Sequence, residues 1–262
     1  MHFNGVAYPS PRNTPEGYKK VILERGWNEL GETRVSSEYV KVKGENMEYE
    51  VSKDLVDADG VLVITHIKGH PCTGFGGAIK NLGMGALSKK TKSAIHSGGE
   101  PVFKREKCSA CRSCEKACPI SGIDFTDSPK FRECLGCSNC AYACPNGAIK
   151  PRINYFDVLL AEGASCANRN FRRKHYISIM KRITKLCDCE RNPGGIIAKD
   201  YGYLSSGDAV SIDLAAHDII AKNEGEVFLR YNKKTGLAQI EAAERFGMGS
   251  RKYDMKILKA NK

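Results

Sequence analysis

The chain has 262 residues, of which 41% are hydrophobic and 27% are charged, a composition that suits one or two globular domains with a real core. No apolar run approaches the length of a membrane span, and the first residues have neither the basic nor the apolar region of a secretory signal, so we expect a cytoplasmic protein with no membrane span. The formal net charge of +11 fits an acidic protein partner or an anionic substrate as well as a polynucleotide. Few aromatic residues accompany the basic runs, which disfavours nucleic-acid binding.

The first 60 residues predict a helix followed by a β-hairpin. Residues 16–29 have apolar positions at helical spacing, and Pro15 suits the first turn of such a helix. Residues 39–43 and 47–51 both alternate with period two across a short polar turn, which predicts two antiparallel strands. Residues 52–57 predict a short helix. Nothing in this region indicates a catalytic function.

Residues 61–65 form a compact apolar run, which predicts a buried strand of a parallel or mixed sheet. A glycine-rich turn with Gly74, Gly76 and Gly77 and then a helix follow this strand. In open α/β sheets such strand ends commonly hold ligands. The glycines do not complete a phosphate-binding pattern, so close approach of the backbone to a neighbouring helix is an equal alternative to ligand binding.

Four side chains in this part of the chain are candidates for catalysis, namely His66, His70, Lys80 and His96. An imidazole can bind a metal or transfer a proton near neutral pH, and a lysine can donate a proton to a substrate. A hydrogen-bonded structural role is the alternative for each histidine.

Residues 103–150 contain a duplicated cysteine motif. The pattern Cys-x2-Cys-x2-Cys-x3-Cys-Pro occurs at residues 108–119 and again at residues 134–145, with every cysteine repeated after 26 residues. This is the bacterial spacing for [4Fe-4S] ligation, in which three cysteines of a line bind one cluster and the fourth binds the other. The sequence therefore predicts two [4Fe-4S] clusters, one bound by Cys108, Cys111, Cys114 and Cys144, and the other by Cys134, Cys137, Cys140 and Cys118.

Disulfides and zinc are the two alternatives for these cysteines. Disulfides require an oxidising compartment, which the N-terminal sequence does not indicate. Structural zinc sites normally use separated pairs of cysteines, whereas here three cysteines share one loop and a fourth precedes proline. Both alternatives are therefore disfavoured.

Residues 151–262 predict a strand at 176–180 and helices at 155–161, 211–221 and 238–246. The basic run 169–175 suits either a docking patch for an acidic protein or an ordinary solvated surface.

Cys187 and Cys189 are separated by one residue and lie outside the duplicated motif. This pair could bind an additional metal, form a redox disulfide or remain inert, and the sequence leaves these alternatives open.

Several segments resemble the iron–sulfur family called domain of unknown function 362. The resemblance extends roughly from residue 16 to residue 258, and the residues that carry it are Lys68-Gly-His70, the glycine run 74–85, Cys187-Asp-Cys189, the run 206–213 and the tail 239–253. Many members of that family carry a two-cluster ferredoxin module inside the domain, so the resemblance implies iron–sulfur binding without assigning a reaction. Longer members have a larger N-terminal region, which implies a sheet here that is incomplete or completed by a partner.

Taken together, these patterns predict an α/β domain with a mixed or parallel sheet, formed by residues 1–102 and 151–262, and an inserted α+β dicluster ferredoxin-like module at residues 103–150. We expect an electron-transfer protein whose clusters serve a site on the α/β domain or a redox partner protein, for which the positive net charge of the chain suits an acidic partner. A reductase is the first alternative, with its metal or substrate site at His66, His70 and Lys80 beside Cys187 and Cys189. An assembly or scaffold protein with structural clusters is the second.

Overall fold

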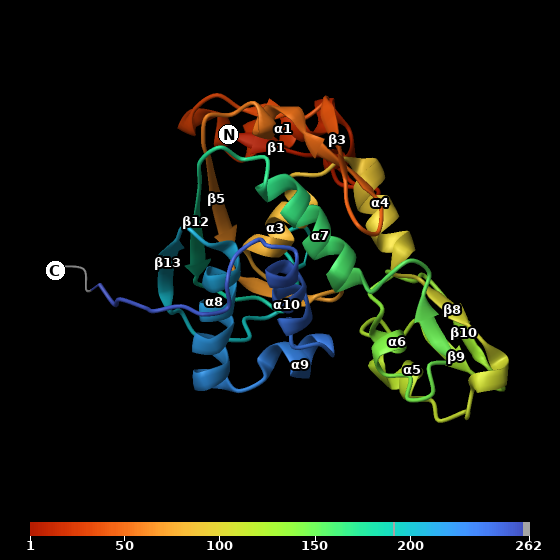
Figure 1. The fold of residues 1–262 in the computed structure, drawn as a ribbon. Coiled ribbons are helices and arrows are strands. Elements are labelled where there is room, and N and C mark those ends of the chain that lie inside the picture. The colour runs from red at the N-terminus through yellow and green to blue at the C-terminus, as the bar shows by residue number, and fades with distance from the viewer. Residues whose placement is uncertain (191, 259–262) are drawn as a thin grey trace.

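The structure is a computed structural model that describes residues 1–190 and 192–258. A larger α/β part contains both ends of the described chain, and a smaller lobe projects from it (Figure 1). The chain enters the lobe after helix α4 (Lys89–Gly98) and returns at helix α7 (Phe156–Asn168). Of the described residues, none belong to a helix that is both long and apolar enough to cross a membrane.

The largest sheet has the strand order β13-β12-β5 and is mixed. Strand β12 (Lys174–Met180) pairs in parallel with β5 (Val61–His66) and antiparallel with β13 (Gly202–Ser206). The predicted strands at 61–65 and 176–180 are therefore confirmed, and β13 is an addition. The fold class is mixed α/β with small sheets, as the sequence predicts at this level.

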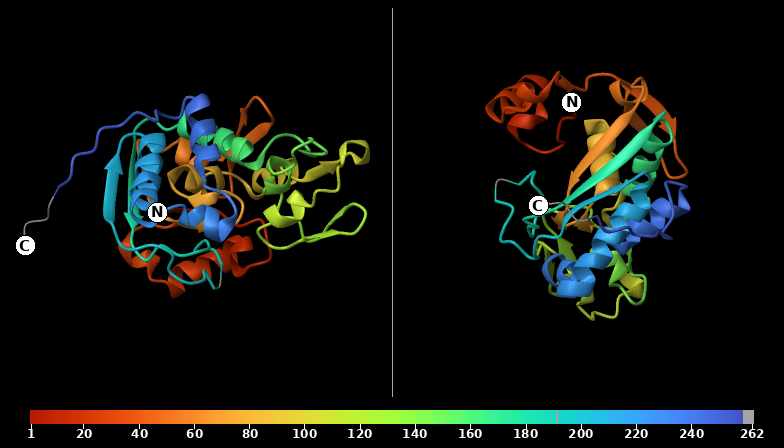
Figure 2. Two further views of the ribbon diagram at one scale, coloured as in Figure 1. Left: turned by 90° about the horizontal axis from the view of Figure 1, so that it is seen from below. Right: turned by 90° about the vertical axis from the view of Figure 1, so that its left-hand side faces the viewer.

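One face of this sheet is packed against helices and the other is open, as the right-hand view of Figure 2 shows. Along β5 the side chains alternate, because successive residues of a strand point to opposite faces. Val63 is buried, whereas Leu62 and Ile64 are 56% and 57% exposed. Tyr203 on β13 is also exposed. The sheet therefore contributes one face only to the core. The strand at 61–65 is thus not buried as the sequence predicts, because no element covers the face that carries Leu62 and Ile64.

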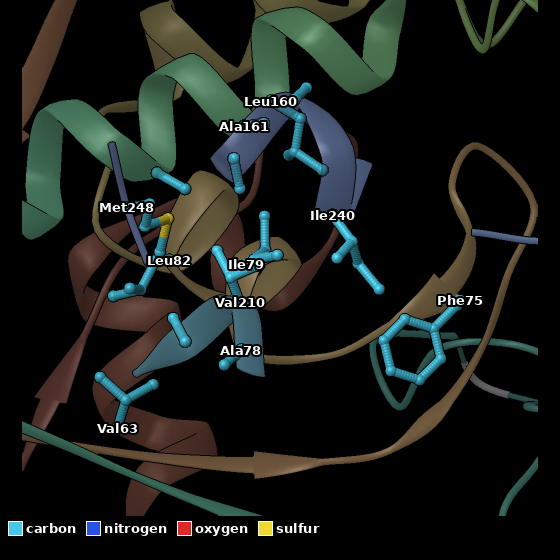
Figure 3. Close-up of a cluster of buried hydrophobic side chains, with 14 of the residues drawn as sticks. Val63, Phe75, Ala78, Ile79, Leu82, Leu160, Ala161, Val210, Ile240 and Met248 are labelled. Carbon is cyan, nitrogen blue, oxygen red and sulfur yellow. The ribbon is translucent and has the colours of Figure 1, made fainter. Parts of the chain in front are cut away.

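The core lies between this sheet and four helices: α3 (Ala78–Gly85), α7, α8 (Ala209–Glu224) and α10 (Leu237–Arg245). Ile79, Leu160 and Val210 meet at its centre (Figure 3). Nearly every residue of α7 is buried, which is typical of a helix surrounded by other elements. This helix therefore connects the core of the α/β part to the smaller lobe.

The other elements of the α/β part are short. They are β1 (His2–Phe3), η1 (Pro11–Asn13), α1 (Pro15–Glu24), η2 (Trp27–Leu30), β2 (Arg34–Val35), β3 (Tyr39–Lys43), β4 (Glu48–Ser52), α2 (Lys53–Val56), β6 (Lys68–His70), β7 (Gly74–Gly76) and α9 (Val227–Asn232). Strands β3 and β4 form the predicted hairpin.

Three expectations about elements need correction. The helix expected over 16–29 ends at Glu24, because Gly26 adopts a left-handed conformation with φ of +68° and a 3₁₀ turn follows. The glycine-rich segment expected as a turn instead forms the β6–β7 hairpin before α3 begins. The helices expected at 155–161 and 211–221 are longer, and α8 starts at Ala209 because the Asp208 side chain accepts two of its first N–H groups.

The smaller lobe contains two antiparallel strand pairs and two short helices. Its elements are β8 (Pro101–Phe103), η3 (Arg105–Lys107), α5 (Ser113–Ala117), β9 (Ile123–Phe125), β10 (Pro129–Phe131), α6 (Asn139–Tyr142) and β11 (Ile149–Pro151). Helix α5 and strand β9 recur after 26 residues as α6 and β11, at the same interval as the cysteines. The lobe also has a small hydrophobic core of its own, which includes Phe125 and Ile149.

Candidate functional site

The backbone of the smaller lobe repeats itself together with the cysteines. Three residues of its first half have φ between 53° and 57°, and the residues 26 positions later have φ between 62° and 65°. These pairs are Ala110 and Gly136, Arg112 and Ser138, and Ser121 and Gly147. A left-handed conformation is costly for residues other than glycine, so the fold must enforce it. Such turns direct successive N–H groups inward and form a cradle for an anionic group.

Two hollows lie inside the lobe, and four cysteines line each of them. Each hollow has a cavity volume of about 20 Å³. The cysteines of the first hollow are Cys108, Cys111, Cys114 and Cys144, and those of the second are Cys118, Cys134, Cys137 and Cys140. The fold thus brings together the same two interleaved sets that the spacing predicts.

Apolar side chains complete the wall of each hollow. Phe103, Phe125 and Ile149 line the first, and Ile123 and Phe131 line the second. Such walls limit water access and lower the local dielectric constant around a bound cofactor.

Backbone N–H groups approach the sulfurs of the second hollow. The N–H of Gly122 donates to Cys118 Sγ at 3.2 Å, and that of Gly136 donates to Cys134 Sγ at 3.3 Å. N–H···S bonds stabilise negative charge on sulfur and tune the reduction potential of a cluster.

Burial disfavours the thiolate form of four of these cysteines, whereas the hydrogen bond with Ser113 lowers the pKa of Cys111. Burial raises the pKa of Cys140 to about 12, and it also raises the pKa values of Cys114, Cys134 and Cys137. Four thiolates in so confined a space would repel each other unless a positively charged centre neutralised them. In the part of the chain that the structure describes, no three donor side chains converge closely enough for a single metal ion. A cubane differs in this respect, because each cysteine binds a separate iron corner.

A buried lysine attaches the second hollow to the α/β part. Lys234 Nζ donates to the carbonyl oxygens of Cys137 and Cys72, both at 2.8 Å, and to Asp157 Oδ2 at 2.7 Å. Asp157 is fully buried on α7, and the Lys234 side chain is 8% exposed. One ammonium group therefore connects the second cysteine loop, the β6–β7 turn and α7.

Helix α4 approaches the same loop at His96. His96 Nδ1 lies 2.7 Å from the carbonyl oxygen of Leu135. At Gly136 a Cβ atom would lie only 1.9 Å from the carbonyl oxygen of His96, so this contact requires glycine. His96 therefore lies beside the second hollow.

A second group of candidate residues lies at the carboxyl end of the parallel strands β5 and β12. His66 ends β5, and its Nδ1 lies 2.9 Å from Asp188 Oδ2 while its Nε2 lies 2.7 Å from the carbonyl oxygen of Lys181. Lys68 Nζ lies 3.1 Å from the same Asp188 carboxylate. Burial would raise the pKa of Asp188, but His66 and Lys68 lower it to about 2, and the hydrogen bond to Asp188 raises the pKa of His66. Two cations thus hold Asp188 in place.

The two cysteines that flank Asp188 lie next to Lys80. Lys80 Nζ is 3.3 Å from Cys187 Sγ, and the Cys189 thiol is hydrogen-bonded to the same sulfur. The hydrogen bond from Cys189 lowers the pKa of Cys187 well below its ordinary value, and the Lys80 charge acts in the same direction. Cys187 is buried and Cys189 is partly exposed. The pair is therefore arranged to hold a thiolate at Cys187.

His70 has a different role in the structure. Its Nδ1 accepts the backbone N–H groups of Cys72 at 3.2 Å and Thr73 at 3.3 Å, which closes the β6–β7 turn. Burial lowers the pKa of His70 well below its ordinary value, so its ring is neutral. This geometry is that of a structural histidine.

A family model described as "Domain of unknown function (DUF362)" matches residues 14–218, which is more than three quarters of the chain. The chain belongs to this family. No curated protein and no solved structure matches it. The DUF362 match includes both the lobe with the two hollows and the loop with Cys187 and Cys189.

In this DUF362 protein the N-terminal segment forms one wall of a groove beside that loop. Phe3, Tyr8, Tyr18 and Trp27 line the groove from one side, and Cys189 lines it from the other. The right-hand view of Figure 2 shows the N-terminal segment and the loop on the same side of the molecule. The sequence indicated no function for the first 60 residues, although the four aromatic side chains within residues 3–27 could have indicated an apolar surface there.

The glycine run of the DUF362 protein is explained by close packing. The Asp213 side chain accepts the N–H groups of Ala78 at 2.6 Å and Ile79 at 2.9 Å, so it already occupies the start of α3. A Cβ atom at Gly77 would lie 2.3 Å from Asp213, and one at Gly74 would lie 2.1 Å from the carbonyl oxygen of Lys234. Close approach of the backbone to a neighbouring helix therefore explains Gly77, which packs against α8, and close approach to the segment after α9 explains Gly74.

Proposed function

We propose that this DUF362 protein binds two [4Fe-4S] clusters and relays electrons through them. The observation that carries the proposal is the pair of hollows, each lined by four cysteines drawn from both halves of the motif. The repeated left-handed residues and the apolar walls both suit anionic iron–sulfur cubes. Cys108, Cys111, Cys114 and Cys144 would hold the first cluster, and Cys118, Cys134, Cys137 and Cys140 the second.

The interleaving of the cysteines favours rapid electron exchange between the two clusters. Cys114 lies in α5 and Cys118 caps the same helix, yet they line different hollows. Because Cys114 and Cys118 are about one helical turn apart, the two clusters that they would bind lie next to each other. Bound clusters supply reversible one-electron chemistry, and the protein supplies their spacing and environment.

The second hollow is the exit toward the α/β part. Its loop is attached through Cys137 and Lys234, and Ser138 Oγ contacts both Gly99 O at 2.9 Å and the N–H of Phe156 at 3.0 Å. The first hollow lies in the half of the lobe without the Lys234 contact, which leaves it as the entry for electrons from a redox partner protein. The basic excess of the chain favours an acidic partner.

Metal analysis after anaerobic purification tests the proposal. We expect about eight iron and eight sulfide per chain, and interacting EPR signals after reduction. Cys111→Ser and Cys140→Ser each remove a ligand from one hollow, so each should lower the iron content toward half. Cys166→Ser is the matched control, because Cys166 is buried in α7 outside both hollows. Colourless wild-type protein without sulfide would refute cluster binding, and clusters that cannot be reduced reversibly would favour a scaffold role.

A reductase is the second candidate, favoured by the Lys80–Cys187 contact beside an open groove. This site lies where two parallel strands end, which is the usual ligand position in α/β sheets. The clusters would then feed a reaction on the same chain. A Cys187/Cys189 double variant that keeps both clusters but loses reductive turnover of a groove ligand would support this candidate.

A further inference from the structure

The loop at residues 187–189 places two thiols one residue apart, next to the buried ammonium group of Lys80. Cys189 is hydrogen-bonded to Cys187, and Lys80 Nζ is 3.3 Å from Cys187 Sγ. We propose that Cys187 and Cys189 form a dithiol–disulfide couple that accepts the two electrons carried by the two clusters and passes them to a disulfide substrate in the groove. This inference rests on the proposed function, because it names the internal electron acceptor.

The surroundings hold the loop in a form suited to this couple. Asp188 is fixed between the two cysteines by His66 at 2.9 Å and Lys68 at 3.1 Å, so the cysteines on either side are held as neighbours. Lys80 stays protonated, because the charges of Cys187 and Cys189 raise its pKa even though burial opposes this. An ammonium group at that distance stabilises a thiolate.

The reaction balances with the groups named. When the Cys187–Cys189 bond is reduced, it takes up two electrons, one from each cluster, and one proton from solvent, so that Cys189 becomes a thiol and Cys187 a thiolate. Lys80 keeps its proton and stabilises the Cys187 thiolate. Thiol–disulfide exchange with a substrate disulfide then restores the Cys187–Cys189 bond and releases one substrate thiol and one substrate thiolate. Two one-electron carriers thus match one two-electron couple.

A chain of packed groups joins the second hollow to this couple. Lys234 bonds the carbonyl oxygens of both Cys137 and Cys72, and Cys72 Sγ lies 4.0 Å from the carbonyl oxygen of Leu135. The turn that contains Cys72 leads through β7 directly into α3, the helix that carries Lys80. The second cysteine loop and the ammonium group beside Cys187 are therefore linked through one short, buried segment.

The groove supplies access for the substrate. Cys189 lines it, whereas Cys187 is 5% exposed, so an incoming disulfide would meet Cys189 first. Arg12 Nη2 donates to the carbonyl oxygen of Cys189 at 2.6 Å and attaches the opposite wall to the loop. Tyr8 and Trp27 present aromatic surface in the same groove. The geometry thus favours a disulfide next to an apolar or aromatic group.

Alkylation and mass spectrometry test the couple independently of any activity. Anaerobic full-length protein is equilibrated in oxidised and reduced dithiothreitol mixtures, quenched with iodoacetamide, digested and analysed for the peptide in which Cys187 and Cys189 are linked. We expect the linked form to appear reversibly in the wild type and in the matched control Cys166→Ser. Lys80→Met should shift the pH profile of Cys187 alkylation upward, because the thiolate loses its ammonium partner.

Stepwise titration with dithionite then counts electrons. Oxidised wild-type protein should take up two more electrons per chain than the Cys187→Ser/Cys189→Ser variant, with the same iron content in both. Cysteines that remain unlinked at every potential, equal electron counts, or a stoichiometric metal lost in the double variant would each overturn the couple. Iron and sulfide analysis tests the proposed clusters separately from the disulfide. A linked peptide in protein without iron would show that the disulfide forms, and it would refute both the clusters and their role as its electron donor.

Discussion

Replacing Lys234 with methionine is the most direct test of how the smaller lobe is attached to the α/β part. The substitution leaves the Asp157 carboxylate without its ion-pair partner and leaves the carbonyl oxygens of Cys72 and Cys137 without this donor. Breaking a buried ion pair from one side typically costs about 3–5 kcal/mol, and each stranded buried polar group about 1–3 kcal/mol. These costs overlap, so we expect Lys234→Met to lower the free energy of unfolding by about 4 kcal/mol.

Anaerobic guanidinium denaturation followed by circular dichroism measures this change, with Lys222→Met as the control because Lys222 is exposed on α8. Adding Asp157→Asn to Lys234→Met should recover part of the loss, since no unpaired charge then remains buried. Lys234→Met should also lower the potential of the cluster at Cys137, because a nearby cation favours the more negative reduced state. A loss below about 1 kcal/mol with an unchanged potential would refute the assigned role of this contact.

Three further outcomes follow from the packing. Gly136→Ala should destabilise the protein by at least about 1–3 kcal/mol in thermal unfolding, because its Cβ would lie 1.9 Å from His96 O, whereas Gly207→Ala, with nothing within 4 Å, should have little effect. Asp213→Ala should cost about 2–4 kcal/mol, because the N–H groups of Ala78 and Ile79 lose their acceptor; an unchanged denaturation midpoint would contradict this. Burial raises the pKa of Asp213 from 3.8 to about 7, so its favourable contribution is complete below about pH 4 and is lost as pH rises through 7, and Asp213→Asn should flatten stability against pH over this range.

The local spacing of the cysteines was enough to predict which of them share a hollow. The two Cys-x2-Cys-x2-Cys loops and the fourth cysteine before proline fix their own geometry over a few residues, and the fold reproduces both interleaved sets. The strand at 61–65 and the hairpin from residue 39 were also predictable, because period and apolarity act locally. The burial of that strand was not, since its outer face has no covering layer in the structure.

Contacts between segments that are distant in the sequence could not be predicted from local patterns. Lys80 and Cys187 are 107 residues apart, and no local pattern indicates that α3 places its lysine against that loop. The occupant of the α3 start was also hidden, since Asp213 lies 135 residues beyond Ala78. In both cases the partner is set by how helices pack on the sheet, which the sequence of either segment alone does not encode.

The two halves of the lobe repeat in backbone but differ in surroundings, and this difference would give the proposed electron relay a direction. The second loop contacts the buried ammonium group of Lys234. Each loop has one exposed cysteine, Cys111 or Cys134, so the exposure of these cysteines does not distinguish the two loops. A nearby cation raises the potential of a cluster, and solvent exposure also changes it, so equal ligand sets need not give equal potentials. The Lys234 cation favours the electron on the second cluster, the one adjoining the β6–β7 turn and α3. Electrons entering at the first cluster would therefore move to the second and on toward Lys80 and Cys187. Anaerobic titration that gives the first cluster a higher reduction potential than the second would refute this direction.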